Sequence, residues 1–134
     1  MTPGKKLSPT TPGVGTGNSG NLFAGLRELL LPYQDDLQVV HNDPAHFYAN
    51  CARPDEKGKA RFFGAVKVSG RKCLFHFMPI YDFPDLLGKI SPALKKRMQG
   101  KSCFNFESMD QDLVAELKGL VGQGVERYRA SGKL

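Results

Sequence analysis

The most basic stretch of this sequence, residues 88–101, is the first candidate for chemistry, and we call it the basic segment. It contains no acidic residue, and its cationic side chains are Lys89, Lys95, Lys96, Arg97 and Lys101. Clustered cations gain affinity for phosphate groups by releasing counterions, and they need no contact with base edges. We therefore predict a site for an anionic ligand or a nucleic-acid backbone at Lys95, Lys96, Arg97 and Lys101. The alternative interpretation is a helix face whose charges contact only solvent.

Established phosphate and nucleic-acid motifs do not account for the basic segment. Residues 100–102, Gly-Lys-Ser, match the end of a phosphate-binding loop, but the complete motif needs a glycine where Lys95 stands. That motif also needs a strand before it and a helix after it, and the order expected here is the reverse. No RNA-recognition, KH or zinc-finger pattern is present, which disfavours sequence-specific reading. No motif identifies a cofactor.

Three histidines and three cysteines offer a second kind of chemistry. They are His41, His46, His76, Cys51, Cys73 and Cys103. None of them lies at a short metal-ligand spacing, although a sheet could gather several, and we expect His76 and Tyr48 to share one face. Cys103 follows the basic segment, whose charge would lower the pKa of its thiol and favour nucleophilic catalysis with a histidine base. Ordinary packing of these side chains is the alternative.

Bulk composition bounds the class of protein. The 134 residues are 40% apolar and 24% charged, close to the average for one globular domain, and the formal net charge is +6. An odd number of widely spaced cysteines fits no disulfide framework, and no run of about 18 apolar residues is present. We expect a cytoplasmic protein that neither spans a membrane nor is exported.

The chain is expected to consist of a tail and one domain. Residues 1–20 are rich in proline, glycine, serine and threonine, and they cannot bury enough apolar surface to offset their ordering entropy. We predict a disordered tail over residues 1–20 and a single α+β domain over residues 21–134. The first helix should start near Ser19 or Asn21 and end at Pro32.

Four strands should follow in an antiparallel meander, over residues 37–41, 45–51, 60–68 and 71–78. The last two form a hairpin with Ser69 and Gly70 in the turn and Val68 opposite Arg71. Alternation then assigns one face of the hairpin to the core. That face carries Phe62, Gly64, Val66, Cys73, Phe75 and Phe77, and the opposite, mixed face includes Phe63, Ala65, Lys67, Leu74 and His76.

The remaining elements alternate between helix and strand. Ser91 followed by Pro92 predicts a helix start, and Gly100 should end that helix. Residues 102–106 predict a strand, and Ser108 with Gln111 predicts a capping box for the terminal helix. The apolar stripe of that helix consists of Leu113, Val114, Leu117, Leu120, Val121, Val125 and Tyr128. This order predicts an α+β sandwich with both long helices packed on one face of an antiparallel sheet.

Residues 62–106 also carry a family resemblance. An aromatic hairpin, Met78-Pro79 with Tyr81, a Pro-Asp-Leu-Leu turn, Ser91-Pro92 with basic residues, and Gly-Lys-Ser before a Phe-x-Phe strand resemble small bacterial proteins of unknown function. That group includes YdhG-like, frataxin-like iron chaperones. The resemblance implies a frataxin-like two-layer sandwich. Iron binding of the frataxin type relies on an acidic ridge along the first helix and the adjoining strand, where this chain has Glu28, Asp35, Asp36 and Asp43.

Three hypotheses for function follow from these observations. The leading one is a non-enzymatic cytosolic binding protein of the frataxin-like type, whose ligand is unknown, with an anion as the candidate. The second is an intracellular iron chaperone, as the resemblance implies. The third is a small enzyme that uses Cys103 or His76.

Overall fold

The computed structural model describes residues 17–134. Its first element, α1 (Gly17–Arg27), takes in residues 17–20, and the rest of the predicted tail lies outside the described residues. A 3-10 helix, η1 (Leu31–Asp36), follows and begins next to Pro32. The predicted first helix and its end before Pro32 are therefore present.

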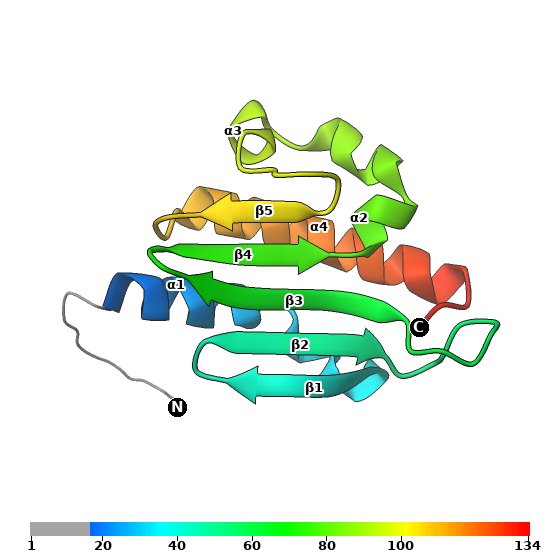
Figure 1. The fold of residues 1–134 in the computed structure, drawn as a ribbon. Coiled ribbons are helices and arrows are strands. Elements are labelled where there is room, and N and C mark those ends of the chain that lie inside the picture. Colours follow the sequence, from blue (N-terminus) through cyan, green and yellow to red (C-terminus); the bar gives the residue numbers. More distant parts are fainter. Residues whose placement is uncertain (1–16) are drawn as a thin grey trace.

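The centre of the domain is one antiparallel sheet of five strands in the order β1-β2-β3-β4-β5. The strands are β1 (Leu37–Asp43), β2 (His46–Cys51), β3 (Phe62–Ser69), β4 (Lys72–Phe77) and β5 (Cys103–Phe106). The predicted meander and the antiparallel sheet are confirmed. Both α1 and the terminal helix α4 (Gln111–Ala130) lie behind this sheet (Figure 1), so the α+β layout with helices on one face is also confirmed.

The core lies between the sheet and these two helices. The sheet contributes phenylalanines at alternate positions, and the rings of Phe63 and Phe77 meet edge to face with centroids 5.5 Å apart. The helices contribute Leu22, Leu26, Leu117, Val121, Val125 and Tyr128, all fully buried. Burial of this apolar surface is the main favourable contribution to folding.

Short helices connect β4 to β5, and α4 holds them in place. They are α2 (Pro79–Asp82), the 3-10 helix η2 (Pro84–Lys89) and α3 (Pro92–Lys95). Tyr128 Oη donates to the Asp82 carboxylate, and Arg127 forms an ion pair with Asp85. At α3, Glu116 accepts hydrogen bonds from the Ser91 amide at 2.5 Å and the Ser91 hydroxyl at 2.6 Å. Three successive connecting elements are thereby attached to one helix.

The β3–β4 hairpin differs from the prediction in two respects. Its turn is Gly70-Arg71, with Gly70 at φ +61°, and Val68 pairs with Cys73 rather than with Arg71. That shift of two residues leaves the faces of β4 unchanged, so Phe75 and Phe77 are buried as predicted.

The assignment of Phe62 and Phe63 is wrong because of a β-bulge. Against β2, Ala49 pairs with Gly64 and Asn50 pairs with Phe62, which leaves Phe63 as the extra residue. Phe63 is fully buried, and Phe62 is half-buried on the opposite face. A bulge inverts the alternation for every residue before it, and the sequence pattern does not reveal it.

Two predictions about the carboxy-terminal half are also wrong. Helix α3 ends at Lys95 rather than near Gly100, because residues 97–99 turn back and pair with β5 through Asn105 N–H to Arg97 O at 2.7 Å and Gln99 N–H to Cys103 O at 2.8 Å. Gly100, at φ +82°, belongs to the turn that follows. Helix α4 is capped by Asp110, whose Oδ1 accepts from the amides of residues 112 and 113, so the predicted capping box does not form.

Gly124 allows α4 to approach the sheet closely. A Cβ at this buried position would lie 2.5 Å from a ring carbon of Phe77 and 2.9 Å from Pro79 Cβ, whereas a Cβ at Gly119 meets nothing within 4 Å. Substitution at Gly124 must therefore displace packed groups, while substitution at Gly119 only changes helix propensity.

We expect Gly124→Ala to destabilise the domain by about 1–3 kcal/mol through overpacking. Gly119→Ala should stabilise it by roughly 0.5–1 kcal/mol, because alanine favours helix over glycine. Urea unfolding of both variants measures the two effects. Equal changes in the free energy of unfolding would show that α4 does not approach Phe77 as closely as described.

Candidate functional site

The face of the sheet opposite α1 and α4 is the candidate site, and we call it the open face. No helix or strand of residues 17–134 covers it (Figure 1). Strict alternation along β2 and β4 buries every second side chain against the helices and turns the others outward. The outward side chains around the middle of this face come from β2, β3, β4 and β5, and they are His46, Tyr48, Phe62, Ala65, Lys67, Leu74, His76 and Cys103.

Five rings form an aromatic row across the open face, from β1 to β4. His41 stacks on His46 with centroids 4.8 Å apart, and the His46 and Tyr48 centroids are 6.1 Å apart. Tyr48 then contacts Phe62 at 4.9 Å, and Phe62 contacts His76 at 4.9 Å. His41 is exposed and the other four rings are half-buried, so each keeps ring surface toward solvent. Exposed neighbouring rings suit planar ligands that stack.

A hollow interrupts the open face at Ala65. Cross-strand pairing places Tyr48, Ala65 and His76 in one line, with Cys103 next to His76 on β5. The methyl group of Ala65 leaves a space of about 190 Å³ between its larger neighbours, and Lys67 and Leu74 wall it on the side away from Phe62. An apolar cavity of about 150 Å³ holds one benzene molecule. The hollow therefore has the size of a single planar ring.

His76 is held in position by Ser102. Its Nε2 lies 2.7 Å from the hydroxyl of Ser102, a buried residue directly before β5. Burial lowers the pKa of His76 from its ordinary value, so this ring is neutral at pH 7. His76 and Tyr48 lie on the same face, as predicted, and they form opposite walls of the hollow.

Cys103 does not have the electrostatics of a nucleophile. Burial raises the pKa of its thiol, and this overturns the expectation that the basic segment would lower it. Burial also raises the pKa of Cys51 and of Cys73 to about 11. Cys103 does pair across the strands with His76, but Nε2 of that histidine is engaged by Ser102.

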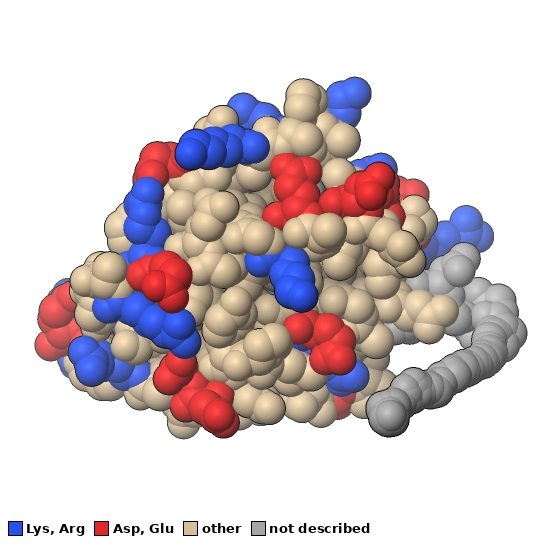
Figure 2. Space-filling view, turned by 180° about the vertical axis from the view of Figure 1, so that it is seen from behind, with Lys and Arg blue, Asp and Glu red and all other residues tan. Residues whose placement is uncertain are grey.

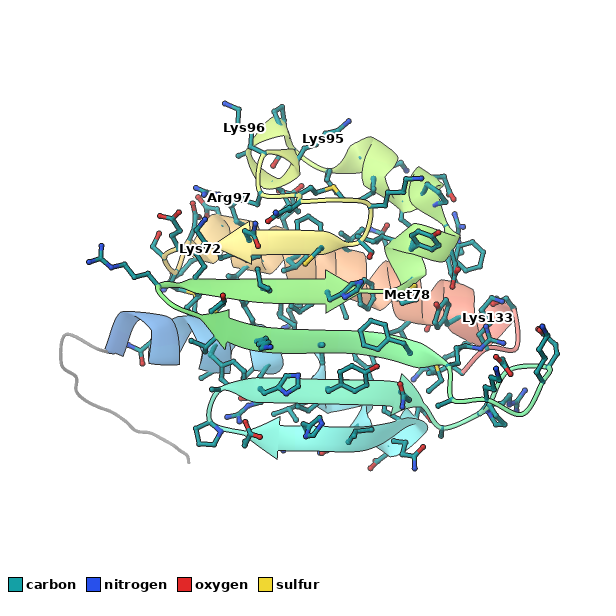
Figure 3. All side chains as sticks on the ribbon, in the orientation of Figure 1. Lys72, Met78, Lys95, Lys96, Arg97 and Lys133 are labelled. Carbon is teal, nitrogen blue, oxygen red and sulfur yellow. The ribbon has the colours of Figure 1, made fainter. Side chains whose placement is uncertain are left out.

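The structure divides the basic segment into two parts. Lys95 and Lys96 extend from α3 in different directions, and Arg97 follows them toward β5 (Figure 3). All three side chains are exposed, and the carbonyl of Arg97 accepts a hydrogen bond from the Asn105 amide, near the end of β5 that is formed by Phe106. Lys101 belongs to the turn at the opposite end of β5, two residues before Cys103. The four predicted cations therefore border the same strand without forming one cluster.

A groove of about 430 Å³ adjoins Lys101. Its other lining residues come from the β4–β5 connection and are mostly apolar; they are Ile80, Tyr81, Pro84, Leu87, Met98 and Gly100. The Tyr81 side chain is 53% exposed. No pattern in the sequence signals this groove, because its lining combines residues 80–87 with Met98, Gly100 and Lys101 from a later part of the chain.

The opposite side of the molecule has a hollow of about 660 Å³ along α4, lined by Leu86, Gly119, Gly122, Gln123, Glu126, Arg127 and Ala130, and none of these side chains is aromatic. Lysine, arginine, aspartate and glutamate side chains alternate over the helices (Figure 2), and several of them pair, as Arg129 does with Asp36 at 2.9 Å. Within the described part of the chain, no three histidine, cysteine or carboxylate side chains lie close enough together to hold a metal ion. None of the helices described is long and apolar enough to span a bilayer.

No family model, curated protein or solved structure gives a significant match to this chain. The resemblance to frataxin-like proteins therefore stays a prediction. What bears on function is the geometry of the open face and of the basic segment.

We expect the Cys103 thiol to alkylate slowly at neutral pH, because its raised pKa keeps it protonated. The rate of iodoacetamide labelling, followed by mass spectrometry of the Cys103 peptide, should reach half its maximum at a higher pH than in the unfolded chain. The same chain unfolded in urea is the control, and its half-maximal rate should fall near the ordinary thiol pKa of about 8.5. A midpoint near pH 7 in the folded protein would restore the enzyme hypothesis.

Proposed function

We propose that this protein binds single-stranded nucleic acid on the open face of its sheet. Bases stack on the aromatic row, and cations beside β5 contact the phosphates. The observation that carries the proposal is the row of five ring side chains across a sheet face that no described element covers. This proposal specifies the anionic ligand of the leading hypothesis from the sequence.

Stacking supplies affinity without selecting a sequence, since every base has a π-face. Each base stacked on an aromatic side chain contributes about 1–3 kcal/mol. Sequence-tolerant binding also agrees with the lack of any base-reading motif in the chain. A duplex conceals the faces of its bases, whereas an unpaired strand can place them on Tyr48 and Phe62. The proposed ligand is therefore a single strand.

Few phosphates should be neutralised in this complex. On the open face, Lys67 lies beside the hollow, while Lys72 lies 3.9 Å from the Glu107 carboxylate. Arg97 and Lys101 border β5, and no carboxylate of the described residues lies within ion-pair distance of either. With about three phosphates neutralised, log affinity should change with log salt by a slope of about −2, because each phosphate of a single strand contributes about −0.7.

We also propose the finer fold assignment, a frataxin-like sandwich, on the strength of two long helices packed against one face of a five-stranded antiparallel sheet. Iron handling has less support. Of the acidic residues near the first helix and strand, Asp36 is engaged by Arg129, and Asp43 accepts a hydrogen bond from the Ala45 amide. Hard iron ions prefer several clustered oxygen ligands. The geometry thus favours nucleic acid over iron.

Removal of one ring from the aromatic row should weaken binding. Tyr48→Ala should raise the Kd for a labelled single strand of about twelve nucleotides by roughly 5- to 150-fold, which corresponds to the stacking free energy of one base. Fluorescence anisotropy at low salt measures this change, and Tyr48→Phe should retain most of the affinity.

Tyr33→Ala is the matched control for this experiment. Tyr33 is also half-buried, but its hydroxyl lies near Gly122 of α4 on the helix side, so removal of its ring should leave the Kd unchanged. Equal affinity for duplex and single strand, or an unchanged Kd for Tyr48→Ala, would refute stacking on the open face. Tight binding of ferrous iron in calorimetry, with no binding of nucleic acid, would favour the chaperone hypothesis.

The basic segment should govern the salt dependence. A variant with Lys95, Lys96 and Arg97 replaced by glutamine should flatten the slope by about 0.7 for each phosphate that is no longer neutralised. Its stability should change little, since exposed charges contribute little to folding. The control variant replaces Lys57, Lys59 and Lys118, three exposed lysines elsewhere on the surface, by glutamine and so has the same net charge. Equal flattening in both variants would mean that net charge alone attracts the ligand.

A further inference from the structure

The groove beside Lys101 lies next to the open face, because residues 101 and 103 line the groove and the hollow respectively. Lys101 lines the groove, Cys103 lines the hollow, and Ser102 between them holds His76. Neighbouring strands are about 4.8 Å apart, so the paired positions Ala65, His76 and Cys103 span about 10 Å of sheet. A ligand that leaves the hollow toward β5 therefore meets Lys101 next.

Tyr81 gives the groove a free aromatic surface. Its ring makes no hydrogen bond or ring contact with any other described residue, and about half of its side chain is exposed. The apolar lining includes Ile80 and Leu87, and the volume of about 430 Å³ exceeds that of the hollow. An apolar groove with one aromatic wall and one cation at its rim is complementary to a base joined to a phosphate.

We propose that a bound single strand occupies two base sites in succession, the hollow over Ala65 and the groove at Tyr81, with an intervening phosphate on Lys101. This inference rests on the proposed function and specifies the path of the strand. The strand crosses β4 and β5 and continues past the sheet, so the groove is reached only by a ligand longer than the one that fills the hollow.

A tryptophan reporter tests this path directly, because the chain contains no tryptophan. In Tyr81→Trp, a strand of about twelve nucleotides should quench the fluorescence, whereas a mononucleotide, which fills the hollow first, should quench it far less. Tyr33→Trp on the helix side is the matched control, and neither ligand should quench it.

Two further variants separate the two base sites. Ala65→Ile fills the hollow with a side chain that favours strands, so the fold is kept and the affinity for both ligands should fall. Lys101→Gln and Tyr81→Ala should both weaken binding of the long strand at least fivefold, and Tyr81→Ala should leave binding of the mononucleotide unchanged.

The outcomes are distinguishable. Binding that depends on Tyr48 but shows no quenching of Tyr81→Trp and no effect of Lys101→Gln would overturn the two-site path and leave the proposed function standing. Absence of binding by any oligonucleotide would overturn both. Quenching by decanoate but not by oligonucleotides would assign the groove to an apolar anion, and the two-site path would again be wrong.

Discussion

Helix α4 can lie against β4 only because Gly124 presents no side chain to Phe77 and Pro79. In this position α4 contacts each of the three short helices that connect β4 to β5. Tyr128 contacts Asp82, Arg127 pairs with Asp85, and Glu116 binds Ser91. The positions of β5, of the turn that carries Lys101 and of the groove at Tyr81 are therefore set from the helix side. The open face and the helices that support it therefore lie in opposite layers of the domain.

A sheet covered on one side needs apolar residues at every second position only, which leaves the alternate positions open to other uses. In β2 and β4 those positions carry His46, Tyr48 and His76. The bulge in β3 adds Phe62, since the extra residue sends Phe63 into the core and its predecessor to the open face. The bulge thus places the Phe63 ring in the core and the Phe62 ring in the aromatic row.

Local patterns in the sequence were sufficient to predict the strands, the terminal helix and the buried side of β4. Those features depend on alternation and helical spacing, which neighbouring residues determine. The aromatic row was not predictable in the same way, because the contact of Tyr48 with Phe62 depends on a bulge between two strands. The division of the basic segment was missed for a similar reason. Residues 97–99 read as part of a helix until their pairing with β5 is known.

That pairing has a consequence for how partners can approach. A strand at the margin of a sheet usually leaves a row of backbone amides and carbonyls without partners, and an extended peptide can add there as a further strand. Here residues 97–99 already occupy the margin beside β5, through the amides of Gln99 and Asn105. At this edge of the sheet, residues 97–99 take the place that an added strand would occupy. An extended peptide therefore cannot pair with β5 along residues 103–105. A ligand that approaches this edge contacts side chains instead of unpaired backbone groups.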